Sequence, residues 1–407
     1  MSSTRTHQRV AMDAPCSADT ECWESGGGAL ILATVVGLVE GVPMFMRKRM
    51  AWCYVIQVLG SVLIALSPLT GQASQNYQVY VSNEKSGDVT VINGSDNQVL
   101  GTIPLGKRPR GIHASPDGST VYVALSGTPI AVPPQLDAKG NPIFEKAKDD
   151  DDDDSAKADK TADAIGVVDV AKRKLTGKIS AGSDPEEFSL SKDGTKLYAS
   201  NEDVKTASVI NIVTGKVEHI IVVGQEPEGV ATTPDGKRFY VTCEAGGEIY
   251  VIETAGYTTV GHFKVNARPR SMDFLSGTGI GFIPSESTGE LNVIDTVNLK
   301  VLKVIALPPG SRPMSVKVAS NGRKIYVSNG RAGTVSVLDS RTYELLNTIK
   351  VGVRPWGMAI SPDGKFLYTA NGPSNDVSVV DLEANKEIAR VKAGTSPWSV
   401  AVVPNTN

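Results

Sequence analysis

The chain has 407 residues, with 41 basic and 44 acidic side chains and a formal net charge of −3. So small a net charge gives no reason to expect nucleic acid as a partner. The 40 glycines and 23 prolines indicate many turns and few long helices. A chain of this length holds either two ordinary domains or one large all-β propeller or barrel.

Residues 46–73 have the pattern of a secretory signal peptide. Residues 46–50 are basic (Met-Arg-Lys-Arg-Met), and residues 51–69 are apolar. The small residues Gly71 and Ala73 then stand at positions −3 and −1 of a cleavage site after Ala73. We therefore expect a mature chain that is periplasmic or secreted and has no stable membrane span.

Residues 1–45 precede this signal and show no usable periodicity. We interpret them as a disordered extension upstream of the true start. The alternative for the apolar stretch is an uncleaved anchor, because 19 apolar residues just span a bilayer.

Cysteine usage agrees with export. Of the four cysteines, Cys16, Cys22, Cys53 and Cys243, only Cys243 lies beyond the cleavage site, so the mature chain forms no intrachain disulfide. The sequence has neither a haem-attachment motif nor zinc-ligand spacing, and we expect no metal site. We expect Cys243 to be an unreactive thiol.

A proline that introduces a short strand recurs seven times. The intervals are 76, 42, 42, 44, 42 and 42 residues, and the first is regular once 34 inserted residues are subtracted. A fixed period of this length is typical of propellers and solenoids. The prolines are Pro109, Pro185, Pro227, Pro269, Pro313, Pro355 and Pro397.

Each unit has the pattern of four short strands, which is that of a β-propeller blade. In the unit after Pro355, alternating segments follow one another, with a Pro-Asp-Gly turn after the first. They are residues 357–361, 368–371, 376–381 and 387–391, with the turn at 362–364.

The two ends of the repeat predict how the ring closes. The repeat begins with a second strand, at residues 77–81, and ends with a first strand, at residues 399–403. We therefore predict an all-β, seven-bladed propeller over residues 74–407, closed by pairing of the N-terminal strands with the C-terminal strand, which removes both free edges.

The inserted residues 128–161 are rich in proline and contain six consecutive aspartates at 149–154. Like charges in a run repel one another, so we predict a solvated loop. A calcium site is the alternative for so many carboxylates, but the Gly and the final Glu of a calcium loop are missing.

A Tyr-Val-Thr-Asn-like element occurs in every unit, and on it the sequence resembles the YVTN-repeat propeller family. We expect these tyrosines and asparagines to pack and to cap turns rather than to carry chemistry. The elements begin at Tyr80, Tyr122, Tyr198, Tyr240, Phe282, Tyr326 and Tyr368.

The residues beside the repeat prolines and after the second strands are expected to gather at one channel mouth. Arginine, which binds carboxylates with a planar fork and stacks on aromatic rings, is frequent there, and both tryptophans of the mature chain occupy the same repeat position. The candidate ligand-binding residues are Arg108, Arg110, Arg268, Arg270, Arg312, Arg354, Trp356 and Trp398. The acidic residues of this rim are Glu84, Glu186, Glu202, Glu228, Glu244 and Glu286.

Two interpretations of this rim stay open. One is a ring of salt bridges, such as Arg110 with Glu186 and Glu228 with Arg270. The other is a site for a flat anionic ligand or an acidic partner in the sector of Arg312, Arg354, Trp356, Trp398 and Arg108, where acidic neighbours are fewer.

We assign no catalytic residue from sequence. No Gly-x-Ser-x-Gly motif occurs, and His113, on a first strand that faces the channel, has no Ser or Cys at local spacing. We interpret His113 as structural.

Several rim segments are similar to a narrower group, the propellers associated with pyrroloquinoline quinone (PQQ)-dependent catabolism. They include residues 106–111, 226–229 and 267–270. The resemblance implies a periplasmic protein with a dehydrogenase, cytochrome or transporter component as partner. PQQ as a ligand follows from this resemblance alone.

The main functional hypothesis is therefore a non-enzymatic propeller that binds an anionic small molecule or a protein at its channel mouth. The alternative is a lactonase-like hydrolase on the same face, since some seven-bladed propellers open lactone rings there.

Overall fold

The computed structural model describes residues 76–130 and 158–404. They belong to the second of two units into which the chain separates, residues 1–71 and 72–407. The expected signal peptide (46–73), the upstream extension (1–45) and the aspartate run lie outside the described residues. No helix within the described ranges is long and apolar enough to cross a membrane.

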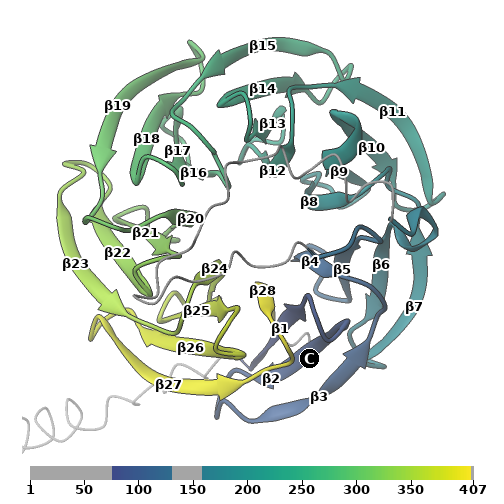
Figure 1. Ribbon diagram of the computed structural model, residues 1–407, viewed down its shortest axis with the longest axis horizontal. Coiled ribbons are helices and arrows are strands. Elements are labelled where there is room, and N and C mark those ends of the chain that lie inside the picture. Colours follow the sequence, from purple (N-terminus) through teal and green to yellow (C-terminus); the bar gives the residue numbers. More distant parts are fainter. Residues whose placement is uncertain (1–75, 131–157, 405–407) are drawn as a thin grey trace, which may run out of the picture. The chain divides into compact units, whose positions relative to one another are not determined.

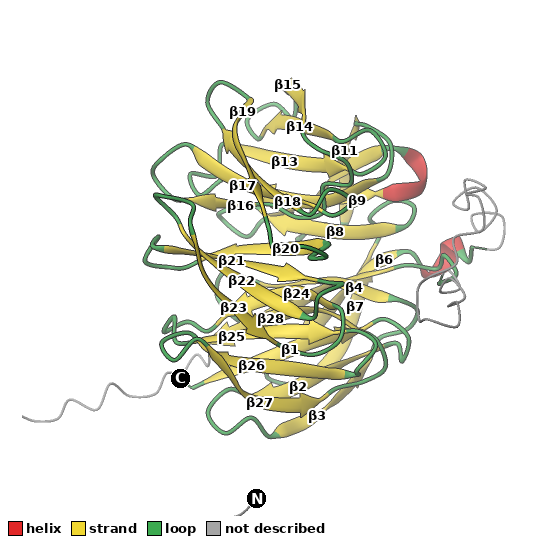
Figure 2. Ribbon diagram, turned by 60° about the vertical axis from the view of Figure 1, so that its left-hand side comes forward, coloured by secondary structure: helices red, strands yellow, loops and turns green. Residues whose placement is uncertain are grey.

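The described residues form 28 strands in seven four-stranded antiparallel sheets around a central channel (Figure 1). The seven-bladed propeller predicted from the repeat is confirmed. Two short 3₁₀ helices, η2 (Lys160–Ala162) and η3 (Glu202–Val204), are the red segments of Figure 2.

The blades follow one another in chain order, and the strands of each run in order from the channel to the outer edge. The closing blade has β28 (Pro397–Pro404), β1 (Tyr77–Asn83), β2 (Asp88–Asn93) and β3 (Val99–Pro104). The next has β4 (Pro109–Ala114), β5 (Thr120–Leu125), β6 (Ala164–Asp169) and β7 (Lys174–Ile179). The third has β8 (Pro185–Leu190), β9 (Lys196–Asn201), β10 (Thr206–Asn211) and β11 (Lys216–Val222).

The remaining four blades complete the ring. They are β12 (Pro227–Thr232), β13 (Arg238–Cys243), β14 (Glu248–Glu253) and β15 (Thr259–Lys264), then β16 (Asp273–Leu275), β17 (Ile280–Ser285), β18 (Glu290–Asp295) and β19 (Lys300–Ala306). They continue with β20 (Pro313–Val318), β21 (Lys324–Asn329), β22 (Thr334–Asp339) and β23 (Leu345–Lys350). The last has β24 (Pro355–Ile360), β25 (Phe366–Asn371), β26 (Asp376–Asp381) and β27 (Lys386–Lys392).

The ring closes as the sequence predicts. Strand β1 pairs antiparallel with β28 from Tyr77 opposite Pro404 to Asn83 opposite Pro397. This pairing leaves neither chain end as a free inner edge, which an open ring would expose to other chains.

The core lies between blades rather than within one of them. The described residues form seven apolar clusters, and each joins side chains of two neighbouring blades. In one, Tyr80 and Val91 pack with Val123 and Leu125 of the next blade. The stability of each blade therefore depends on its neighbours.

The repeat asparagine joins its own strand to side chains of the following strand. Asn329 Nδ2 donates to Ser336 Oγ at 2.8 Å and to Thr334 Oγ1 at 3.0 Å. Asn201 makes the matching bonds to Ser208 and Thr206.

The channel mouth as the candidate functional site

One backbone device, repeated in all seven blades, builds the rim. The residue before each repeat proline is left-handed, with φ between 39° and 59°, although none of the seven is glycine. Its carbonyl accepts a hydrogen bond from the N–H of the residue that directly follows the second strand, at 2.9 to 3.4 Å. The pairs, acceptor first, are Ser396 with Glu84, Arg108 with Ser126, Asp184 with Glu202, Glu226 with Glu244, Arg268 with Glu286, Arg312 with Gly330 and Arg354 with Gly372.

A second repeated bond fixes the residue after four of the seven repeat prolines. The hydroxyl of the repeat Ser or Thr donates to the carbonyl of that residue in the next blade, at 2.6 to 2.9 Å. The four pairs are Ser82 with Arg110, Ser200 with Glu228, Thr242 with Arg270 and Ser328 with Trp356. These bonds place guanidinium, carboxylate and indole groups at the same height around the channel.

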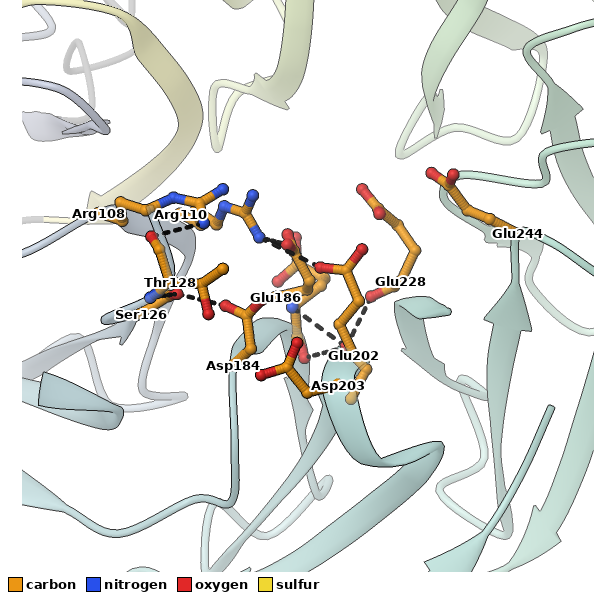
Figure 3. A network of polar contacts seen from close by, with 12 residues as sticks. Arg108, Arg110, Ser126, Thr128, Asp184, Glu186, Glu202, Asp203, Glu228 and Glu244 are labelled. Carbon is orange, nitrogen blue, oxygen red and sulfur yellow. Dashed lines mark hydrogen bonds and ion pairs between the residues drawn. The ribbon is translucent and has the colours of Figure 1, made fainter. Parts of the chain in front are cut away.

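Arg110 is the centre of one ion cluster (Figure 3). Its side chain is only 11% exposed and contacts Glu186, Glu84 at 3.3 Å and Glu202 at 3.6 Å. The neighbouring Arg108 also contacts Glu84 at 3.3 Å, and it donates to the carbonyl of Thr128 at 2.8 Å. The cluster therefore ties the start of the insertion to the rim.

Arg270 is the centre of a second cluster. It contacts Glu228 at 3.0 Å, Glu286 at 2.7 Å and also Glu244, and its side chain is 10% exposed. Arg268 pairs with Glu244 at 2.6 Å, and Arg312 pairs with Glu286 at 3.0 Å. The predicted pairs Arg110 with Glu186 and Glu228 with Arg270 are both present, so the salt-bridge interpretation holds for this part of the rim.

The carboxyl groups of the two clusters differ in proton affinity. Burial raises the pKa of Glu202 to about 8, and the guanidinium of Arg110 opposes the shift only in part. Burial likewise raises the pKa of Glu244 well above its usual range, and a hydrogen bond with Glu228 adds to this. For Glu286 the attraction of the surrounding arginines, Arg270 first, outweighs burial and holds the pKa at about 2. A neutral carboxyl, Glu202, and a carboxylate, Glu286, therefore coexist at neutral pH.

Arg354, Trp356 and Trp398 form a third group, which we call the indole sector. The two indole rings lie 5.4 Å apart, and the guanidinium carbon of Arg354 lies 5.0 Å from the Trp356 ring. Arg270 reaches the same ring from two blades away, at 5.8 Å. The expectation that both tryptophans project to one side is confirmed.

Below the rim is a cavity of about 380 Å³, lined by residues of all seven blades. Glu228, Arg270, Trp356 and Trp398 contribute to its wall. Its volume lies within the usual range of small-molecule sites. Of the predicted binding residues, Arg270 and the two tryptophans therefore reach the cavity, whereas the others remain on the rim.

His113 lines this cavity as expected, but the sequence pattern did not indicate its partner. Its Nε2 lies 2.8 Å from Glu187 Oε1. The position two residues after the repeat proline is Gly or Ser in every other blade, and Glu only at 187. A Cβ on the facing Gly111 would lie 2.4 Å from Glu187 Oε1, so this glycine makes room for the carboxylate. The glutamate at 187, in a position that is otherwise Gly or Ser, could therefore have indicated this pair from the sequence.

Two other groups carry no evident chemistry. Carboxylate oxygens of Asp184, Glu186 and Glu202 lie within 4.8 Å of one another, but the Arg110 guanidinium contacts two of the three. A cation at this point would meet a resident positive charge. Cys243 is buried, and burial raises the pKa of its thiol to about 12, as expected for an unreactive cysteine.

Fold and site together define a seven-bladed β-propeller whose channel mouth combines ion-paired carboxyls with an indole pair. Residues 223–396 match the model of a family described as "Lactonase, 7-bladed beta-propeller". A comparison with curated proteins gives no match.

Solved structures share the fold at low identity. A putative 6-phosphogluconolactonase from Bacteroides uniformis is 16% identical with a TM-score of 0.63, over 81% of this chain and 100% of that one. The periplasmic gluconolactonase PpgL of Pseudomonas aeruginosa is 18% identical with a TM-score of 0.61, over 81% and 99%. Hydrazine synthase of Kuenenia stuttgartiensis is 21% identical with a TM-score of 0.59, over 73% and 90%.

Proposed function

We propose that the channel mouth binds a lactone and hydrolyses its ring. The observation that carries this proposal is the Glu228 carboxyl, which lines the cavity beside groups whose pKa is raised, Glu202 and Glu244. A carboxyl whose pKa is raised, such as Glu202, is suited to act as a proton donor near neutral pH. The match of residues 223–396 to the lactonase model supports the same function.

The chemistry assigns one role to each of two residues. The Glu228 carboxylate takes a proton from the water that adds to the lactone carbonyl carbon. When the tetrahedral intermediate collapses, the ring C–O bond breaks, and the neutral Glu202 carboxyl gives its proton to the leaving alkoxide. Figure 3 shows Glu202 next to Glu228, as this requires. The product is the open hydroxy acid.

The test is turnover of phosphorylated and unphosphorylated aldonolactones, measured as acid release above the buffer rate, with and without added divalent metal. Glu228→Gln should lower kcat/KM by about 10²–10⁴-fold, the usual contribution of a general base. The matched control is Glu387→Gln on the outer strand β27, where Glu387 pairs with Arg390 in solvent and no effect is expected.

The pH profile gives a second readout. In the wild type kcat/KM should fall as the pH rises through about 8, because Glu202 then loses the proton that it donates. The Glu202→Gln variant should have a lower kcat/KM than the wild type, and its kcat/KM should not fall above pH 8, because the amide does not titrate. Absence of turnover on the whole panel would end the proposal.

A second candidate is the non-enzymatic binding propeller, which the guanidinium groups of Arg270 and Arg354 beside the Trp356 ring favour. PQQ, a flat anion, and a periplasmic dehydrogenase, cytochrome or transporter component are its ligand and partners by resemblance only, and the comparisons give no support for the PQQ-associated group. Calorimetry with PQQ should show binding that the double variant Arg354→Ala/Trp356→Ala weakens at least tenfold. Equal affinity in both proteins would refute it.

We also propose that the chain is exported. The basic, apolar and small-residue pattern of residues 46–73 supports this, and one solved structure with the same fold is named as periplasmic. N-terminal sequencing of the exported protein should begin at Ser74, and an uncleaved chain would contradict the proposal.

A further inference from the structure

The indole N–H of Trp398 is a buried donor that lacks an acceptor. The residue is 7% exposed, and its Nε1 has no hydrogen-bond partner among the described residues. Buried indole N–H groups normally find a partner, because an unpaired donor loses its hydration without compensation. Trp398 also lines the channel cavity. A ligand bound in the cavity therefore lies next to this residue and can supply the missing acceptor.

Arg354, in the neighbouring blade, has no carboxylate in direct contact among the described residues, although Glu286 and Glu84 attract it from further away. In the described parts of the chain it makes no ion pair, whereas Arg108, Arg110, Arg268, Arg270 and Arg312 each contact at least one glutamate. The reason lies in the rim device. The residue whose N–H bonds the Arg354 carbonyl is Gly372. In four other blades the equivalent residue is a glutamate, whose carboxylate is available to pair with a rim arginine.

The surroundings of Arg354 also favour an added negative charge. Loss of hydration lowers the pKa of its guanidinium and outweighs the opposing attraction of Glu286 and Glu84, and the positive charges of Arg270 and Arg312 add to the lowering. Below the sector, Met272, Met314 and Met358 line the cavity with adaptable apolar side chains.

From these features we propose that the indole sector is an anion subsite, in which a ligand carboxylate or phosphate accepts the Trp398 N–H and pairs with Arg354. The flat or apolar body of the ligand then packs on Trp356 and the methionines. This deepens the proposed function, since it requires a ligand that carries a negative charge besides the lactone ring.

The direct test observes the two indole protons. The full chain has four tryptophans, so each Trp→Phe variant removes one indole cross-peak from a ¹H–¹⁵N spectrum and thereby assigns it. The probes are benzoate, phenyl phosphate and the uncharged benzyl alcohol. We expect the Trp398 indole proton to move downfield with one or both anions and to stay in place with the alcohol. Which anion binds more tightly identifies the headgroup.

Affinity gives the second readout. Trp398→Phe keeps an aromatic ring but loses the donor, and it should weaken anion binding about tenfold. Trp356→Phe is the matched control in the same ring pair, with no buried unpaired N–H, and should weaken it less. Arg354→Gln should weaken it at least tenfold.

The outcomes separate this inference from the proposed activity. If the Trp398 proton responds to neither anion in the wild type, the subsite does not exist, whether or not lactones turn over. If it responds and no lactone is hydrolysed, the subsite stands and the proposed activity fails.

Discussion

Arg270→Met should lower the free energy of unfolding at neutral pH by about 3–5 kcal/mol, the usual cost of removing one partner from a buried ion pair. Methionine fills a similar volume, but Glu228, Glu244 and Glu286 then lose the guanidinium that all three contact. Urea unfolding followed by tryptophan fluorescence and circular dichroism measures the change.

The pH dependence of this loss has a definite sign. In the wild type the pKa of Glu286 is about 2, below its unfolded value, so its stabilising contribution is present above about pH 4.5 and is lost as the pH falls towards 2. Without Arg270 the pKa of Glu286 rises, because Arg270 is the largest of the attractions that oppose its burial, and the contribution of Glu286 to stability shrinks. The deficit should therefore be largest at pH 7 and should shrink as the pH falls towards 2.

A surface arginine provides the control for this variant. Arg390 is 41% exposed and pairs with Glu387 at 2.9 Å on β27, and Arg390→Met should cost about 0–1 kcal/mol, as exposed pairs do. If Arg270→Met were as stable as Arg390→Met at pH 7, the second ion cluster would not be a structural centre of the rim.

The overall fold could be predicted from the sequence because the fold is periodic. A proline every 42 residues and a strand pattern that begins in mid-blade were sufficient to predict both the number of blades and the closing pair. Position in the repeat also predicted which residues share the rim, since equivalent residues of a ring stand at equal heights. Arg110 with Glu186 and Glu228 with Arg270 followed from that reasoning.

Position in the repeat did not predict how far the long side chains extend across the channel mouth. Arg270 extends past its neighbour to the Trp356 ring two blades away, which repeat position cannot show. Glu187 bonds His113 across a blade boundary because Gly111 leaves the space. The raised pKa values of Glu202 and Glu244 depend on burial, which only packed coordinates give. The chemistry of the mouth therefore had to be read from the structure.

Removal of residues 397–407 should prevent the chain from folding as a stable monomer. Strand β28 supplies the inner strand of the closing blade, and Val400, Ala401 and Val403 belong to two of the seven core clusters. The loss should exceed the about 2–5 kcal/mol of a single large-to-small core substitution, because several buried side chains and a complete strand pairing disappear together. Size-exclusion chromatography and urea unfolding measure it.

The missing strand should be replaceable from outside. A synthetic peptide of residues 397–404 can pair with the exposed edge of β1 in the register from Tyr77 to Asn83, as strand-addition complexes do. We expect it to restore a cooperative unfolding transition in the shortened chain, whereas a scrambled peptide of the same composition should not. Since the peptide carries Trp398, quenching of that indole by benzoate reports whether the rebuilt blade also restores the indole sector. A shortened chain with the urea midpoint of the full chain would show that ring closure contributes little to stability.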